Sequence, residues 1–143
     1  MLSFKDYISI KVHKADLVMT SLIKARLAPF NLAPEQNLIM MLLWEQNGLS
    51  QHKLVEALDK DKTNIARMAS NLEKKGFVRR IHCTEDRRSV KVFLTEEGRK
   101  LGEQVIPVAE QFNAAVTEGI TDEELAEMER LLLKMKANAE AQL

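Results

Sequence analysis

The chain of 143 residues has a single cysteine, so no disulfide can form within it. Small secreted domains that lack a large core usually depend on several disulfides, and this class is therefore excluded. Its three histidines, His13, His52 and His82, are scattered and show none of the spacings typical of metal ligands. We expect no metal site.

Long apolar runs are also missing. The longest extends from Leu38 to Trp44, far short of the roughly 20 residues that cross a bilayer. Near the N-terminus Lys5, Asp6 and Lys11 interrupt the apolar residues, which does not fit a signal peptide. Repeats and low-complexity segments are absent as well. The sequence therefore predicts a cytoplasmic protein with no membrane partner.

The sequence lacks the common catalytic motifs. It contains neither a G-x-S-x-G nucleophile motif nor a phosphate-binding glycine loop, and its acidic residues are expected on exposed helix faces. We therefore expect no catalytic residues, no cofactor and no enzymatic activity.

Net charge is zero, but the charges are unevenly distributed. Residues 50–91 carry eleven lysines and arginines against six acidic residues, whereas residues 110–143 carry three against eight. A basic centre of this kind indicates a surface that faces a polyanion.

The centre of this basic region is predicted to be a helix that begins after Asp61. The Asp61 carboxylate can accept hydrogen bonds from the free N–H groups of the first turn, and Gly76 suits the turn that ends the helix. Apolar residues at three- and four-residue spacing predict one buried face: Ile65, Met68, Ala69 and Leu72. The opposite face is polar and partly cationic, with Lys62, Thr63, Asn64 and Arg67.

Two short strands are predicted next, over residues 77–83 and 90–94, joined by a charged tip. Arg87 and Arg88 make this tip a projecting positive point, and Asp86 is placed to orient Arg88. Duplex DNA fits both features, because its major groove admits a helix and its minor groove attracts an inserted arginine.

Two helices are expected before this unit. Pro34 begins one that ends near Gly48, although Ala33 is a weak N-cap, and its predicted core residues are Leu38, Ile39, Met41, Leu42 and Trp44. Ser50 caps a shorter helix that turns at residues 59–60 into the helix at Asp61. This is the spacing of a helix-turn-helix.

Long helices are expected at both ends of the chain. The first is predicted from Ser3 to about Leu27, and Pro107 is expected to kink or divide a helix that follows Thr95. Thr121 begins the last helix, which has a narrow apolar seam formed by Leu125, Met128, Leu132, Met135 and Ala139. Such a seam suits a partner helix.

Three motifs follow one another along this part of the chain: Leu72-x-x-x-Gly76-Phe77-Val78-x-Arg80, Asp86-x-Arg88 and Leu94-Thr95-x-x-Gly98. In their residues, order and spacing they resemble the MarR family of winged helix-turn-helix regulators. The resemblance implies a mainly α fold with a small β-wing, as one MarR-like domain over residues 1–143. Residues 32–98 would form the winged helix-turn-helix region, and residues 1–31 and 99–143 the dimerisation helices.

By the same resemblance, a homodimer would bind a near-palindromic operator in double-stranded DNA, with half-sites roughly 34–36 Å apart. Asn64 could pair with adenine and Arg67 with guanine. Repression is the expected action; activation stays open, since the outcome depends on where the operator lies. A small aromatic or phenolic effector would release the DNA. The implied DNA-binding residues are Ser50, Gln51, Lys53, Lys62, Thr63, Asn64, Arg67, Asp86, Arg87 and Arg88.

Two alternatives remain open at this point. A winged-helix module can bind a protein instead of DNA, and such a module would tolerate loss of Arg87 and Arg88. A regulator of this kind could also sense oxidants through Cys83, although Cys83 falls on the first wing strand and not in the N-terminal helix where the peroxide-sensing branch usually keeps its thiol.

Overall fold

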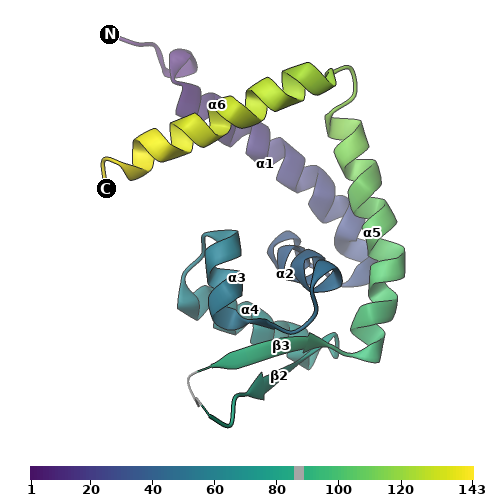
Figure 1. Cartoon of the computed structure of the whole chain (residues 1–143). Helices are drawn as coiled ribbons and strands as arrows, with labels where there is room; N and C mark the ends of the chain where they lie inside the picture. The colour runs from purple at the N-terminus through teal and green to yellow at the C-terminus, as the bar shows by residue number, and fades with distance from the viewer. Residues whose placement is uncertain (86–88) are drawn as a thin grey trace. The chain divides into compact units, whose positions relative to one another are not determined.

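The computed structural model describes residues 1–85 and 89–143, so Asp86, Arg87 and Arg88 lie outside the described residues. The chain divides into two compact units, Met1–Phe112 and Asn113–Leu143. Figure 1 shows the elements, which follow in chain order: η1 (Phe4–Asp6), α1 (Ile8–Leu27), η2 (Ala28–Phe30), α2 (Pro34–Glu45), β1 (Leu49–Ser50), α3 (Gln51–Leu58), α4 (Lys62–Lys74), β2 (Val78–His82), β3 (Val90–Leu94), α5 (Glu96–Val116) and α6 (Asp122–Glu140).

The helix-turn-helix is α3 and α4, and both predicted caps are confirmed. Ser50 Oγ accepts from the backbone N–H of Lys53 at 3.1 Å, and Asp61 Oδ1 accepts from that of Asn64 at 2.7 Å. Asp59 ends α3 in the left-handed conformation, with φ of 52°, which turns the chain sharply toward α4. Gly76 follows α4 with φ of 84°, as its position predicted.

A single core joins α2, α3, α4 and the sheet of the first unit. All four α4 residues predicted to face inward are buried, and they pack with Leu54, Val78 and Val92. In α2 the prediction was partly wrong, because Leu38 and Met41 are each 41% exposed. The buried face of α2 is instead Gln36, Asn37, Ile39, Met40 and Leu43, which follow the helical repeat.

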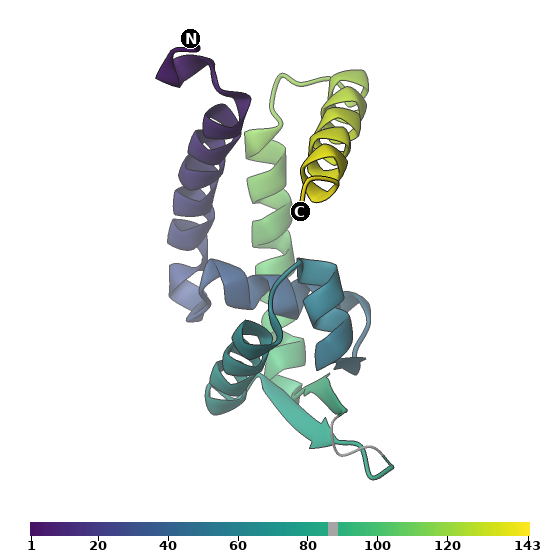
Figure 2. The same ribbon diagram turned by 90° about the vertical axis from the view of Figure 1, so that its left-hand side faces the viewer.

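The wing is part of a three-stranded antiparallel sheet in the order β1-β3-β2. Val78 pairs with Leu94 and His82 with Val90, while Leu49 of β1 pairs with Val92 on the other edge of β3. The strand β1 was not predicted, since two residues cannot display an alternating pattern. Figure 2 shows the β2–β3 hairpin projecting from the end of the first unit.

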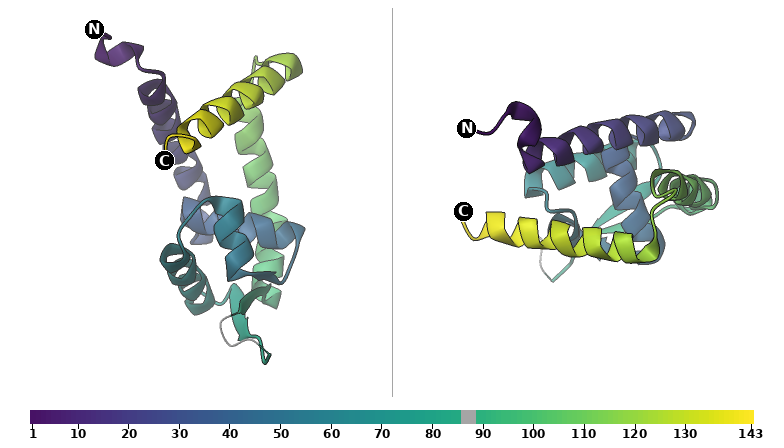
Figure 3. Two further views of the ribbon diagram at one scale, coloured as in Figure 1. Left: turned by 60° about the vertical axis from the view of Figure 1, so that its left-hand side comes forward. Right: turned by 90° about the horizontal axis from the view of Figure 1, so that it is seen from above.

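The N-terminal prediction needs a correction. Ser3 caps only the short helix η1, and Tyr7 then adopts an extended conformation before α1 begins at Ile8. Of the α1 residues, only Leu27 is buried, and large apolar side chains such as Leu17 and Val18 are 55% and 70% exposed. Figure 3 shows α1 leading into α2, with α3 and α4 beside α2.

Later in the chain, α5 continues through Pro107 without a break, so Pro107 does not divide it. In the second unit, Thr121 caps α6 in a capping box with Glu124, as predicted. Met128 and Leu132 of its predicted seam are 50% and 43% exposed. Over the described residues, no helix combines the length and apolar character needed to cross a membrane.

Candidate nucleic-acid interface

The outward face of α4 is polar and cationic, as the sequence predicted. Lys62, Thr63 and Arg67 are exposed and Asn64 is half-buried. The opposite face of the same helix is anchored by side chains that are almost wholly buried. The core therefore holds α4 firmly while its cationic face stays accessible.

The polar residues of α4 are connected to one another. Asp61 Oδ2 accepts from Asn64 Nδ2 at 3.0 Å, in addition to its capping hydrogen bond. Asn64 Oδ1 in turn accepts from Arg67 Nη2 at 2.7 Å. Sequence reasoning identified each of these residues but not their connection.

A pocket of about 190 Å³ lies where the start of α3, the first turn of α4 and the start of β3 meet. It brings together three predicted site residues: Ser50, Gln51 and Lys62. Gln51 Oε1 is buried and has no hydrogen-bond partner in the described part of the chain. Lys53 is exposed in the first turn of α3 but is not among the residues that line the pocket, which are Ser50, Gln51, His52, Lys62, Ser89 and Val90.

Sequence reasoning missed His52, Ser89 and Val90 as members of this surface. His52 could have been suspected from its place in the first turn of α3, beside Ser50. No local pattern identifies Ser89 or Val90, because their position depends on the pairing of β3 with β1 and β2.

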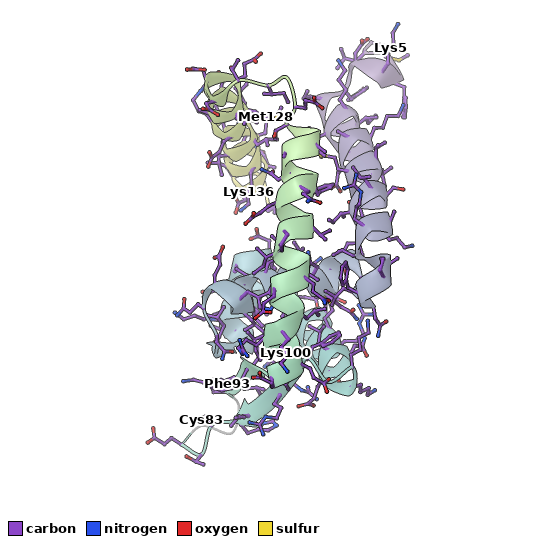
Figure 4. The ribbon with its side chains drawn as sticks, turned by 90° about the vertical axis from the view of Figure 1, so that its right-hand side faces the viewer. Lys5, Cys83, Phe93, Lys100, Met128 and Lys136 are labelled. Carbon is purple, nitrogen blue, oxygen red and sulfur yellow. The ribbon has the colours of Figure 1, made fainter. Side chains whose placement is uncertain are left out.

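The hairpin is closed near its tip by a hydrogen bond between the backbone N–H of Cys83 and the carbonyl of Ser89, at 2.9 Å. Figure 4 shows Cys83 farther along the hairpin than Phe93. The predicted wing residues Asp86, Arg87 and Arg88 lie outside the described residues, so the expected Asp86–Arg88 pair stays a prediction.

Arg80, which belongs to the family-like motif, connects the wing to α4. Glu73 Oε2 accepts from the Arg80 backbone N–H at 2.8 Å, and Glu73 Oε1 accepts from the guanidinium at 3.3 Å. The pKa of Glu73 is lowered from its ordinary value, chiefly by the backbone hydrogen bond from Arg80. Burial, the second-largest effect, opposes this shift, and the Arg80 guanidinium lowers the pKa further.

Glu73→Gln is expected to lower the melting temperature modestly near neutral pH. The pKa of Glu73 is lower in the folded than in the unfolded protein, so the ionised side chain stabilises the fold. This stabilisation is fully present above the unfolded-state pKa and is lost as the pH falls through the folded-state pKa. The parent and the variant should therefore converge in melting temperature at strongly acidic pH. Their melting curves across the acid range test this.

Glu96→Gln is the control for that experiment. Glu96 pairs with Arg99 three residues away, where both side chains are more than half exposed, and such surface pairs contribute little. We expect Glu96→Gln to lower the melting temperature less than Glu73→Gln does. An equal change in both variants would contradict the role assigned to Glu73 in linking α4 to the wing.

Lys75 has a structural role that the sequence did not reveal. Its Nζ donates to the carbonyl of Asn31 and to Gln36 Oε1, each at 2.7 Å. These contacts tie the end of α4 to the start of α2, so this cation is engaged within the fold. Over the described residues, no three His, Cys, Asp or Glu side chains are grouped so as to hold a metal ion.

A helix pair joined by a tight turn, followed by a β-hairpin on the same core, defines a winged helix-turn-helix protein. The MarR family model matches residues 32–90. The transcriptional regulator HosA of Escherichia coli O157:H7 is 30% identical over 105 residues, which cover 73% of this chain and 78% of HosA. The chain belongs to the MarR family of transcriptional regulators.

Two solved structures share the fold over nearly the whole chain. The MepR–DNA complex of Staphylococcus aureus has a TM-score of 0.85 at 23% identity and covers 96% of this chain and 99% of MepR. BpsR of Bordetella bronchiseptica has a TM-score of 0.85 at 24% identity, and the match covers 95% of this chain and 97% of BpsR.

Proposed function

We propose that this protein is a sequence-specific transcriptional regulator that binds a near-palindromic operator in double-stranded DNA as a homodimer and represses from it. The observation that carries the proposal is the exposed cationic face of α4, held on a rigid core beside the start of α3 and the start of β3. A helix presented in this way fits the major groove.

The predicted residues divide into three groups by the part of the DNA that they meet. Lys62, Thr63 and Arg67 are exposed on α4 and face the base edges and the phosphates beside them. Ser50, Gln51 and Lys53 at the start of α3 meet the DNA backbone, where contacts set affinity and orientation and carry little sequence information. Arg88, oriented by Asp86, would reach the minor groove, and Arg87 would be a neighbouring phosphate or groove contact. Family membership and the DNA-bound structure of MepR support this assignment.

The apolar surfaces of the terminal helices support the dimer. Leu17 and Val18 of α1 and Met128 and Leu132 of α6 are all more than 40% exposed in the single chain, and contiguous apolar surface on a helix marks an interaction site. A second copy of the chain would cover them, with residues 1–31 and 99–143 as the dimerisation segments and residues 32–98 as the DNA-binding region.

A small aromatic or phenolic effector would release the protein from DNA. BpsR, which shares the fold, has its DNA binding regulated by 6-hydroxynicotinic acid. The family consists of regulators and not enzymes, and we extend this to the present chain. A cytoplasmic location follows from the same function.

Selection from a library of random duplexes tests the proposal. The protein should enrich one inverted repeat whose half-sites lie about one helical turn, roughly 34–36 Å, apart. An enriched single half-site would contradict the dimeric arrangement. No enriched sequence at all would contradict sequence-specific binding and favour the protein-binding alternative.

Arg88→Ala is expected to weaken operator binding about tenfold while leaving the dimer intact, because the side chain would lose its contact with the minor groove. Binding is measured by fluorescence anisotropy, and the oligomeric state by light scattering. Lys136→Ala on α6, outside the proposed DNA surface, is the control and should bind as the parent does. Unchanged binding by Arg88→Ala would contradict the role of the wing.

A further inference from the structure

Three side chains of α4 form a hydrogen-bonded chain that leads from the cap of the helix to its exposed face. Asp61 accepts from the side-chain amide of Asn64 at 3.0 Å, and Asn64 Oδ1 accepts from Arg67 Nη2 at 2.7 Å. Each residue lies three positions after the one before it, and this spacing brings side chains together on a helix surface. The chain therefore ends on the cationic face described above.

The two charged ends fix the orientation of the amide between them. A carboxylate only accepts hydrogen bonds and a guanidinium only donates them, whereas an amide has one end of each kind. If the Asn64 amide were reversed, its oxygen would face the Asp61 carboxylate and its NH₂ group would face Arg67. Only the observed orientation satisfies both neighbours.

This arrangement restrains Arg67 before any DNA is bound. Arg67 is exposed and makes no ion pair within residues 1–85 and 89–143, so its hydrogen bond to Asn64 is what holds the guanidinium. One of its five N–H donors is used, and the others stay available as a planar fork. Such a fork matches the O6 and N7 acceptors of guanine, and a side chain that is already ordered loses less entropy on binding.

We propose that Asp61 and Asn64 are positioning residues for Arg67, which recognises a guanine in the major groove, and that Asn64 does not itself contact a base. The inference rests on the proposed DNA-binding function. It replaces the pairing of Asn64 with adenine, since both ends of the Asn64 amide are engaged within the helix.

The test measures discrimination at each base pair of the operator selected by the parent protein, with every single-base variant of that duplex. Arg67→Ala should lose discrimination at one base pair in each half-site, by about tenfold. Asn64→Ala should lose several-fold at the same base pair. The double variant should lose no more than Arg67→Ala alone, because Asn64 acts only through Arg67.

Two further variants separate positioning from folding. Asp61→Ser keeps a side-chain oxygen that can cap the helix, but one oxygen cannot hold both the backbone and the amide of Asn64. It should keep the helical content and lose part of the discrimination at the same base pair. Asn71→Ala, the same residue change on the same helix outside the hydrogen-bonded chain, should keep the parent's discrimination.

The result that would overturn the inference is loss of discrimination by Asn64→Ala at a different base pair, with effects that add to those of Arg67→Ala. That pattern would mean that Asn64 contacts a base directly. Unchanged discrimination in Asn64→Ala would overturn it as well. A parent protein that selects no operator would instead contradict the proposed function itself, and so the two failures are distinguishable.

Discussion

Leu132→Glu is expected to turn the dimer into a monomer or to unfold the chain. Leu132 lies in the apolar seam of α6 and is 43% exposed in the single chain, so we place it in the interface with the second copy. A carboxylate buried there without a partner would cost several kcal/mol, which exceeds what an ordinary interface contact contributes. Light scattering across a concentration series measures the change.

Leu133→Glu is the matched control. It makes the same substitution at the next residue, which is 58% exposed but lies on a different face of α6 from the seam. We expect this variant to stay dimeric. A dimeric Leu132→Glu variant, or a stable dimer after removal of residues 121–143, would contradict the interface that we propose.

Gly98→Ala is expected to destabilise the fold strongly, although the same change normally stabilises a helix by up to about 1 kcal/mol. A Cβ at this position would lie 2.0 Å from the carbonyl oxygen of Phe77, which is backbone and cannot rotate away. That oxygen accepts from the Thr95 N–H at 3.0 Å, and the Gly98 carbonyl accepts from the Trp44 indole at 3.0 Å.

Any shift of α5 that relieves this clash would break these hydrogen bonds, so we expect a loss of about 3 kcal/mol, at the upper end for overpacking. Gly119→Ala is the control. Its Cβ would meet nothing within 4 Å, and only its φ of 79° opposes the change, at about 1 kcal/mol. Chemical denaturation of the two variants measures the difference. Equal losses would contradict the close approach of α5 to Phe77.

The helix-turn-helix could be predicted because its signals are local. Ser50 and Asp61 are strong caps and Gly76 is a strong stop, and the buried face of α4 follows a clear repeat. In α2 the apolar residues are consecutive, so the sequence could not decide between Met40, which is buried, and Met41, which is exposed. That choice depends on where α3, α4 and β3 pack.

In the candidate site, too, local signals predict some residues, while the roles of others depend on contacts between elements. Exposed residues such as Lys62 and Arg67 follow from the helical repeat of α4. The roles of Arg80 and Lys75 do not, because each cation is engaged by groups from another element: Glu73 for Arg80, and Asn31 with Gln36 for Lys75. A count of positive charges therefore overstates the surface available to DNA.

Binding to duplex DNA from upstream of the protein's own gene, beside a scrambled duplex, tests the central claim most directly. We expect a clear preference for the native duplex, with the logarithm of the affinity falling by about 0.9 per neutralised phosphate for each unit of log salt. Equal, salt-sensitive binding to both duplexes would contradict sequence-specific recognition of that region. Absence of binding to either would contradict the account of α4 and the wing as a DNA-binding surface.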